Sequence, residues 1–491
     1  MTVQTERDAE ASFWRPEDLG RPIPASPHAV SVALPRWQDV VGYEEKKPEV
    51  VERLSSGYPR FVVHMRVKEL AQQLAGNRPC LPFPSARVAR LAADFIKKNS
   101  GESAEVISQG GAHGVIAHGA TGETALRAFW QHAGLIVSSR EAEARLASRA
   151  ESLEGETARG ALRQQIAALY ECAESDVFLA PTGMASVFTA LRALNSRATG
   201  LRTVQLGFPY VDTLKLQEKA GYGAVLIHDL SQTENKLTAL LGKEKLGGVF
   251  CEVPGNPLLS SPDLSGLSAL LRRQNVPLVV DDVVATPVNV DISPYADLIA
   301  TSLTKFFVGS GDAMGGALIC NPRSPFYAEL KPLVMQEHEE LLWGDDAVVL
   351  AEGGKDFVPR MKRHNAGGLF IAERLRAHPG VERVWYPKWE SGQAYEAVRR
   401  LDGGYGALLS FVPKNAKQTA PRIYDALQLC KGPSLGTVFT LACPFTLLAH
   451  YQELDWAESC GVSRYLIRVS VGLEEPQEIW RRLEEACRGL S

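Results

Sequence analysis

The sequence lacks the patterns that define several protein classes. Its eight cysteines form no Cys-x-x-Cys pair and no Cys/His cluster at zinc spacing, so we expect reduced thiols of an intracellular protein without a metal site. A net charge of -4 provides no basic excess for nucleic acid or an anionic membrane surface. No apolar run approaches the roughly 20 residues of a spanning helix, and the first residues show no basic-then-apolar signal pattern. These absences favour a cytoplasmic protein whose partners are small molecules, not nucleic acid or membrane.

The chain is long enough for more than one folded unit. It has 491 residues, 45% of them hydrophobic, which suffices for two or three domains with buried cores. Residues 1–135 contain Pro and Gly clusters and only short helical candidates such as residues 65–74, so we expect an irregular extension that packs on something else. The sequence predicts a large domain over residues 136–340 and a smaller α+β domain over residues 341–491.

The large domain alternates helical patterns with short β-rich runs. Such alternation predicts an α/β fold with a mainly parallel sheet covered by helices on both faces. The expected strands lie in the runs TVQLGF, AVLIH, GGVFCEVP, PLVVDDVV, LIATSL and GGALIC. In such a sheet, ligands bind at the carboxyl ends of the strands.

Three features fall at that carboxyl edge. Residues 179–194, LAPTGMASVFTALRAL, place Thr-Gly-Met at a strand-to-helix turn whose free amides suit a phosphate. Residues 277–287, PLVVDDVVATP, end a strand with two carboxylates, and residues 301–305, TSLTK, end another with hydroxyls and an amine. Each feature alone is common on protein surfaces. Together they match the needs of pyridoxal phosphate, namely an amine to attach it, a carboxylate for its ring nitrogen and a phosphate-binding turn.

The run SLTKFFVGSGDAMGG makes the combination specific. It resembles the S-x-T-K-x-x-x-G-x-x-D motif of the cystathionine γ-synthase group, the trans-sulfuration or Cys/Met-metabolism family of fold-type-I pyridoxal phosphate enzymes. The resemblance covers residues 130–491 approximately and implies the aspartate aminotransferase-like fold of these transferases. It also implies that Lys305 forms the Schiff base with the cofactor, while Ser302 and Thr304 hold the phosphate.

Further positions match the family's cofactor-binding residues. By this resemblance, Gly183 and Met184 present amides to the phosphate, and Asp281 faces the pyridine nitrogen. Tyr210, in GFPYVDTLKL, corresponds to the tyrosine that stacks on the ring and is expected to transfer protons near the leaving group.

The substrate-binding residues also follow from the resemblance. CEVPGNPLL is similar to E-S-P-x-N-P, which places Asn256 near the cofactor and the substrate carboxylate. SRYLIRVSVGLEE is similar to R-x-S-V-G-x-E, so Arg468 is expected to bind the α-carboxylate in a fork. Ser434, in PSLGTVF, is expected beside it.

Three positions depart from the family pattern. Relatives carry Tyr-x-Arg on a segment that reaches the phosphate of the neighbouring subunit, whereas residues 138–140 read Ser-Ser-Arg. Arg140 is then expected to bind phosphate across an interface. We also expect residues 1–135 to form an inter-subunit arm. A homodimer is then the minimal catalytic unit, and a homotetramer is the expected assembly. Phe439 stands where relatives often have Glu, which implies a distal substrate pocket without a carboxylate. Asp282 replaces the usual Asn.

The resemblance leaves the reaction open. The long extension is most like the fungal type of cystathionine γ-synthase, which implies γ-replacement on an O-acylhomoserine-type amino acid. The alternatives are γ-substitution with a carbon, nitrogen or other sulfur nucleophile in a specialised pathway, a γ-lyase reaction, and a non-catalytic subunit. An intact lysine, acid and phosphate-binding turn argue against the last.

Overall fold

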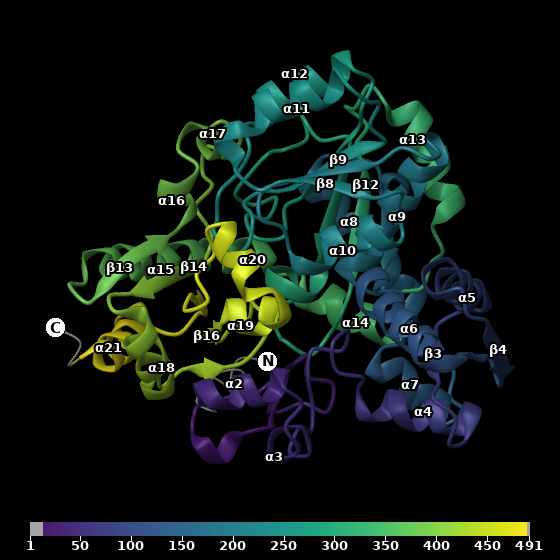
Figure 1. Cartoon of the computed structure of the whole chain (residues 1–491), viewed down its shortest axis with the longest axis horizontal. Coiled ribbons are helices and arrows are strands. Elements are labelled where there is room, and N and C mark those ends of the chain that lie inside the picture. The colour runs from purple at the N-terminus through teal and green to yellow at the C-terminus, as the bar shows by residue number, and fades with distance from the viewer. Residues whose placement is uncertain (1–12, 489–491) are drawn as a thin grey trace.

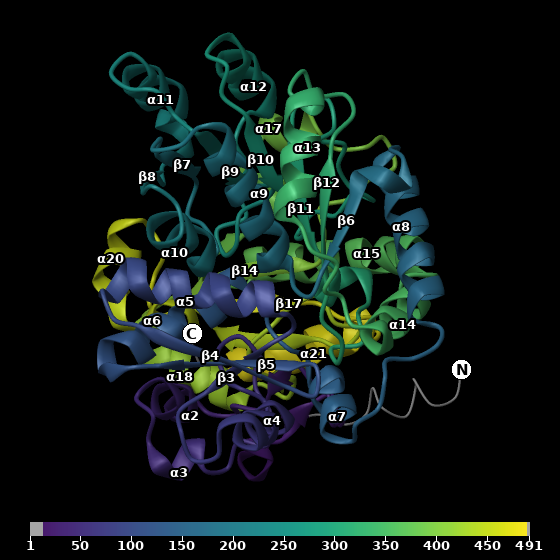
Figure 2. The same ribbon diagram turned by 90° about the vertical axis from the view of Figure 1, so that its right-hand side faces the viewer.

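A seven-stranded sheet forms the centre of the large domain. The computed structural model describes residues 13–488. The strand order is β6-β12-β11-β10-β9-β7-β8, and only β12 runs antiparallel to its neighbours, which confirms the expected mainly parallel α/β sheet. Figure 2 shows the strands across the sheet in this order. The strands are β6 (Val177–Ala180), β7 (Thr203–Leu206), β8 (Ala224–Ile227), β9 (Gly248–Glu252), β10 (Leu278–Asp281), β11 (Leu298–Ser302) and β12 (Gly316–Cys320).

Helices cover both faces of this sheet. Successive side chains of a strand accordingly belong to two different buried clusters. In β9, Val249 and Cys251 belong to one cluster, whereas Phe250 belongs to the other. The helices of this domain are α7 (Ser139–Leu146), α8 (Gly155–Tyr170), α9 (Gly183–Arg197), α10 (Val211–Lys219), α11 (Thr233–Leu241), α12 (Leu264–Arg273), η4 (Leu303–Phe307), α13 (Tyr327–Glu337) and α14 (Gly344–Gly353).

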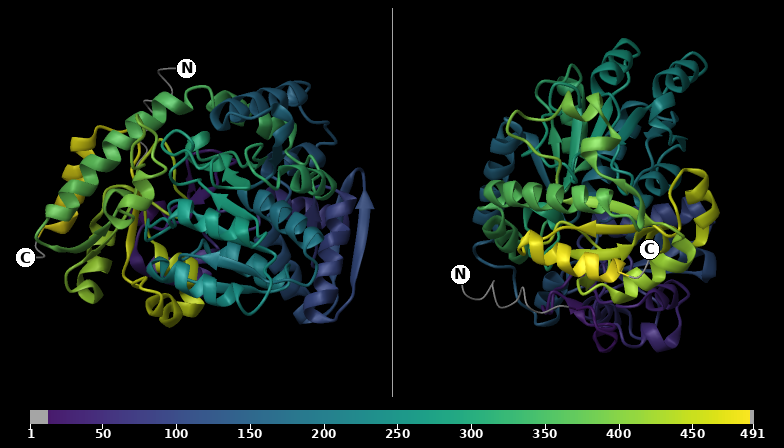
Figure 3. Two further views of the ribbon diagram at one scale, coloured as in Figure 1. Left: turned by 90° about the horizontal axis from the view of Figure 1, so that it is seen from above. Right: turned by 90° about the vertical axis from the view of Figure 1, so that its left-hand side faces the viewer.

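The C-terminal domain is the expected smaller α+β unit. Its five strands pair in the order β13-β14-β17-β16-β15, and α15 packs beside α21, as both views of Figure 3 show. The strands are β13 (Val381–Trp385), β14 (Leu408–Pro413), β15 (Cys430–Lys431), β16 (Leu441–Pro444) and β17 (Ile467–Ser470). The helices are α15 (Phe357–Ala377), α16 (Pro387–Glu390), α17 (Gln393–Glu396), α18 (Ala416–Ala426), α19 (Phe445–His450), η5 (Tyr451–Glu453), α20 (Leu454–Ser459) and α21 (Pro476–Cys487).

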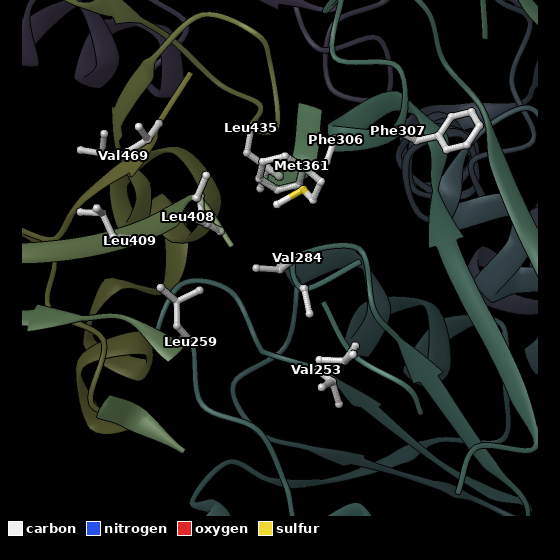
Figure 4. Packing of buried hydrophobic residues seen from close by; sticks show 14 of the residues in the cluster. Val253, Leu259, Val284, Phe306, Phe307, Met361, Leu408, Leu409, Leu435 and Val469 are labelled. Carbon is white, nitrogen blue, oxygen red and sulfur yellow. The ribbon is translucent and has the colours of Figure 1, made fainter. Parts of the chain in front are cut away.

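Buried apolar side chains join the two domains. Figure 4 shows Val284 and Phe306 of the large domain facing Met361 and Leu408 of the C-terminal part. All four side chains belong to one continuous hydrophobic cluster. The two domains therefore share a core, which fixes their relative position at the carboxyl edge of the sheet.

The N-terminal region is more regular than the sequence analysis predicts. The expected helix at residues 65–74 is present as α4 (Met65–Ala75), but a three-stranded antiparallel sheet and two long helices follow it. These elements are β3 (Leu81–Phe83), α5 (Ala86–Ser100), β4 (Ala104–Gln109), β5 (Ala112–Ala117) and α6 (Gly119–Ala133). The expectation of an irregular extension with only short helices is wrong for this part of the chain. Among residues 13–488, no helix combines the length and the apolar character needed to cross a membrane.

Residues 13–64, which we call the N-terminal strap, lie against the C-terminal domain (Figure 1). The strap contains β1 (Pro22–Ile23), β2 (Ser31–Val32), α2 (Trp37–Glu44) and α3 (Pro48–Val51). Tyr424 donates a hydrogen bond to the carbonyl of Leu34 (2.8 Å), and the amine of Lys431 donates to the carbonyl of Pro35 (2.9 Å). These buried hydrogen bonds direct the following residues of the strap towards the carboxyl edge of the large sheet.

Candidate active site

A cavity of about 140 Å³ lies at the carboxyl edge of the sheet. Its walls come from three parts of the chain: the ends of β9, β10 and β11, the C-terminal domain, and the N-terminal strap. Most of the residues singled out in the sequence line it. These are Gly183, Met184, Tyr210, Asn256, Asp281, Ser302, Lys305, Ser434 and Arg468.

Lys305 lies in η4, directly after β11, and its amine points into the cavity. Nζ donates a hydrogen bond to Oγ of Ser434 (2.8 Å) and lies 4.4 Å from the ring centre of Tyr58. Burial lowers the pKa of Lys305, although the neighbouring Tyr58 opposes this effect. A lowered pKa favours the neutral amine, which is the nucleophilic form.

The start of α9 forms a tight turn against the end of β11. Thr182 caps the helix by accepting a hydrogen bond from the amide of Ala185 (3.1 Å). A Cβ on Gly183 would lie 2.7 Å from Cβ of Ser302, so only glycine fits there. The structure thus brings Gly183, Met184 and Ser302 together beside free helix amides, where an anion is stabilised.

Thr304 does not line the cavity. Its hydroxyl donates to the carbonyl of Gly315 (3.3 Å) and accepts from the amide of the same residue (3.1 Å). Thr304 therefore ties η4 to the start of β12 and positions Lys305 through the backbone. The sequence pattern alone did not distinguish this contact from a phosphate contact.

Two buried carboxylates end neighbouring strands at the cavity floor. Burial raises the pKa of Asp281 to about 6, while burial and the nearby Asp281 raise the pKa of Glu252 to about 8. Glu252 accepts hydrogen bonds from the amides of Tyr210 and Asn256. It therefore fixes the two loops that carry these cavity residues. Sequence reasoning missed Glu252, although it is the first residue of the E-V-P-G-N-P run.

Asp282 lies on the other side of β10 from Asp281. Its two carboxylate oxygens accept from the hydroxyl of Tyr170, each at 2.9 Å, and burial raises its pKa to about 7. Successive side chains leave a strand on opposite faces, so Asp282 points away from the cavity. It contacts Tyr170 at the end of α8 instead.

Arg468, on β17, forms the opposite wall. Nη1 donates to Oδ1 of Asn256 (3.2 Å) and Nη2 to the carbonyl of Ser434, and the guanidinium lies 5.0 Å from the ring centre of Phe445. The side chain is 6% exposed in the cavity wall. A buried guanidinium held in this way suits a carboxylate ligand.

The strap adds two residues that sequence reasoning missed, Tyr58 and Arg60. Arg60 donates hydrogen bonds to Asp212 and to the hydroxyl of Tyr210. Burial alone would raise the pKa of Asp212, but Arg60 and His132 lower it to about 2. A signal for both residues was present, because Tyr58-Pro59-Arg60 repeats the Tyr-x-Arg spacing that the sequence analysis sought only at residues 138–140.

Besides Thr304, two predicted site residues lie outside this cavity. Arg140 donates to the carbonyl of Asp312 (2.6 Å) and to Oδ1 of Asp346 (3.1 Å), both in its own chain. Phe439 packs with Phe13 and Leu441 in a separate apolar cluster. Its ring therefore packs where the strap contacts the C-terminal domain. It does not line the cavity.

The residues in the cavity fit pyridoxal phosphate. The glycine turn leaves space that a side chain would fill, the helix amides are free for a phosphate, Asp281 is buried where a ring nitrogen would be paired, and Lys305 has a lowered pKa. A lysine, an acid and a phosphate-binding turn at the carboxyl edge of an α/β sheet define a pyridoxal-phosphate-dependent enzyme site.

Comparisons with known proteins agree with this class. The model of the family described as Cys/Met metabolism PLP-dependent enzyme matches residues 142–488, and the chain belongs to this family. Cystathionine gamma-synthase of Neurospora crassa is 33% identical, with 94% of this chain and 97% of the relative covered. The L-2-amino-4-chloropent-4-enoate dechlorinase/desaturase of Streptantibioticus cattleyicolor is 34% identical, with 96% and 98% covered.

Solved structures show the same fold. Apo CalE6, a methionine gamma lyase from Micromonospora echinospora, aligns with a TM-score of 0.56 at 27% identity, over 68% of this chain and 86% of that chain. A putative O-acetylhomoserine (thiol)-lyase from Campylobacter jejuni, solved with N'-pyridoxyl-lysine-5'-monophosphate, aligns with a TM-score of 0.60 at 21% identity over 68% and 86%. The fold is that of fold-type-I enzymes, and the cofactor of the family is pyridoxal phosphate.

Proposed function

We propose that the protein replaces an activated γ substituent of an amino acid, such as the acyl group of an O-acylhomoserine, with an incoming nucleophile. The observation that carries this proposal is that Lys305 and two arginines line one cavity. Arg468 lies on one wall and Arg60, bonded to Tyr210, on another. The site can therefore bind an α-carboxylate at one position and assist a leaving group at a second.

The cofactor-binding roles follow from the positions of the side chains. Lys305 would carry the cofactor, Gly183, Met184 and Ser302 would hold its phosphate, and Asp281 would pair with its ring nitrogen. When bound, pyridoxal phosphate supplies an electron sink for the pair left by a departing proton.

The substrate roles belong to this chain's own residues. Arg468, Asn256 and Ser434 bind the α-carboxylate and orient Cα towards the amine of Lys305, which accepts its proton. Tyr210 donates a proton to the leaving group. Its pKa is raised well above the ordinary range, chiefly by burial, so it carries its proton at neutral pH, and Arg60 then stabilises the phenolate.

A second candidate is removal of the γ substituent without replacement. Two observations favour it: the cavity wall near the strap is apolar, with Phe61, Phe445 and Leu448, and the relative from Streptantibioticus cattleyicolor is named a dechlorinase/desaturase. Apolar surface favours a halogen or small acyl substituent over a charged one.

Product analysis by mass spectrometry distinguishes the two reactions. The holoenzyme is incubated with O-acetyl-, O-succinyl- and O-phosphohomoserine and with a γ-chlorinated amino acid, each with and without a panel of thiols, amines and carbon nucleophiles. A product that joins the two substrates supports replacement. A 2-oxo acid or an unsaturated amino acid under every condition supports removal alone and contradicts our first proposal.

We also propose that the enzyme is a homodimer at minimum and a homotetramer in full. The support is the resemblance to a family of enzymes with paired subunits, although Tyr58 and Arg60 line the cavity of their own chain. Native mass spectrometry of the holoenzyme tests this, and a monomer at micromolar concentration would contradict it.

A further inference from the structure

Three carboxylates line the cavity, and two of them have partners or a role already. Glu252 accepts two backbone hydrogen bonds, and Asp281 accepts one from the amide of Val283 (2.9 Å) and is assigned to the cofactor. The third is Glu44, the last residue of α2. Within residues 13–488, its carboxylate makes no hydrogen bond or ion pair with another protein group, which leaves it free for a ligand.

Glu44 stands where the cavity meets a second, outer cavity of about 460 Å³. Tyr43, Arg60, Phe61 and Leu448 line both spaces together with Glu44. Lys305, Asp281 and Arg468 line only the inner one. The proposed carboxylate-binding site thus belongs to the inner cavity alone, and Glu44 lies where the two spaces meet.

The chemistry of the mouth restricts what Glu44 can bind. Of the residues that line both spaces with Glu44, Phe61, Leu448 and Ala449 are apolar, and the guanidinium of Arg60 already donates to Asp212 and Tyr210. A half-buried carboxylate in such surroundings gains most from a ligand that brings its own N–H or S–H group. This is the property of an amine or thiol nucleophile and not of an acyl leaving group.

We propose that Glu44 is the proton acceptor for the amine or thiol of the second substrate. This inference rests on the γ-replacement function proposed above. In the step, the nucleophile's lone pair forms the new bond to Cγ while the Cβ–Cγ double bond left by loss of the leaving group opens. The electron pair of that double bond takes up a proton at Cβ, in place of the one lost there earlier, and the nucleophile's own proton passes to Glu44. The earlier bond from Cγ to the leaving group has already broken, with the proton supplied by Tyr210. The overall reaction therefore moves one proton from the nucleophile to the leaving group and needs no oxidant or reductant.

The electrostatics of the mouth are compatible with this role. Burial raises the pKa of Glu44 to about 7, and Lys46 opposes the effect. The carboxylate can therefore take up and release a proton near neutral pH. Lys46, Tyr43 and Tyr451 interact electrostatically with Glu44. The other charged and titratable groups that line the outer cavity are Arg60, Arg127, His132, Lys215, Lys219, His450 and Glu453.

The test compares Glu44→Gln with Glu45→Gln. Glu45 is the next residue, but it is exposed and pairs with Lys47 (2.8 Å) and Tyr451 (2.6 Å), so it controls for the loss of one negative charge. We expect Glu44→Gln to lower kcat/KM for the nucleophile about 100-fold. The change in kcat/KM for the nucleophile near pH 7, seen in the wild type, should be absent from the variant. The nucleophile-independent release of 2-oxo acid, measured on the same holoenzyme, and the melting temperature should stay at wild-type values.

Three outcomes would overturn the proposal. If Glu44→Gln and Glu45→Gln behave alike, or if release of 2-oxo acid falls as much as replacement, Glu44 does not act on the nucleophile. If the wild-type enzyme forms no joined product with any nucleophile, the γ-replacement function fails first and the role of Glu44 fails with it. The wild-type measurement therefore separates the two failures.

Discussion

Arg60 donates a hydrogen bond to the hydroxyl of Tyr210, although 150 positions separate the two residues in the chain. The same guanidinium pairs with Asp212, which lies two residues after Tyr210 and is fully buried. The strap and the large domain are therefore joined beside Tyr210 by a buried ion pair.

Breaking this pair should affect both stability and turnover. We expect Arg60→Met to lower the free energy of unfolding by about 3 kcal/mol, because it leaves a buried carboxylate without its cation. The double variant Arg60→Met/Asp212→Asn should regain most of that stability but not the turnover, since Tyr210 still lacks its partner. Urea unfolding and steady-state kinetics measure the two effects. Equal recovery of both would show that Arg60 has only a structural role.

Lys305→Ala should abolish turnover and leave the fold intact. The amine is assigned both to cofactor attachment and to proton transfer at Cα, and its removal leaves a small cavity beside Ser434. Circular dichroism and product analysis measure the outcome. Turnover near the wild-type rate would contradict the assignment of the whole site.

The origin of the strap residues can be tested by mixing two inactive variants. Tyr58 and Arg60 reach the cavity of their own chain in this structure, so Arg60→Ala and Lys305→Ala subunits together contain no intact site. We expect no recovery of activity after subunit exchange, which differently tagged subunits would report by co-purification. Recovery in proven mixed dimers would mean that the strap serves the neighbouring subunit.

The stability of the cofactor-free protein should depend on pH through Glu252. Its pKa is raised from the ordinary 4.5 to about 8, chiefly by burial. The folded state binds the proton more tightly than the unfolded state, so this contribution is fully present below pH 4.5 and is lost as the pH rises towards 8. The unfolding free energy should fall by up to roughly 1.4 kcal/mol per pH unit across this window.

Glu252→Gln should flatten that slope, whereas Glu45→Gln should leave it unchanged. Denaturant unfolding at intervals from pH 5 to about pH 8 measures it. A slope equal in wild type and Glu252→Gln would mean that another group controls the dependence.

The strands, and the site residues that follow their carboxyl ends, are encoded by local sequence patterns. This explains why they are predictable. Apolar runs such as LIATSL identify β11, and Lys305 follows directly. The hairpin between β4 and β5 was predictable but missed: Gly110 and Gly111 both have positive φ, as a two-residue turn requires. Likewise, Ser85 caps α5 at one end and Gly101 ends it in the left-handed region.

Contacts between distant segments were beyond the reach of sequence patterns. Nothing local places Glu44 or Tyr58 in a cavity formed by residues more than 100 positions later. Conversely, Phe439 follows the motif segment that carries Ser434, yet it packs against Phe13 and the strap instead of the cavity. Its role in the distal pocket stays a prediction, and Phe445 and Leu448 line the cavity whereas Phe439 does not.

The strap's hydrogen bonds to the C-terminal domain have a consequence for the timing of biosynthesis. The hydrogen bond from Lys431 to the carbonyl of Pro35 can form only after Lys431, 396 positions later, has been synthesised. At ribosomal speeds this interval is roughly 20–80 s. The strap is synthesised before both domains and is therefore among the last segments to be placed. During that interval the carboxyl edge of the sheet can form without its strap wall.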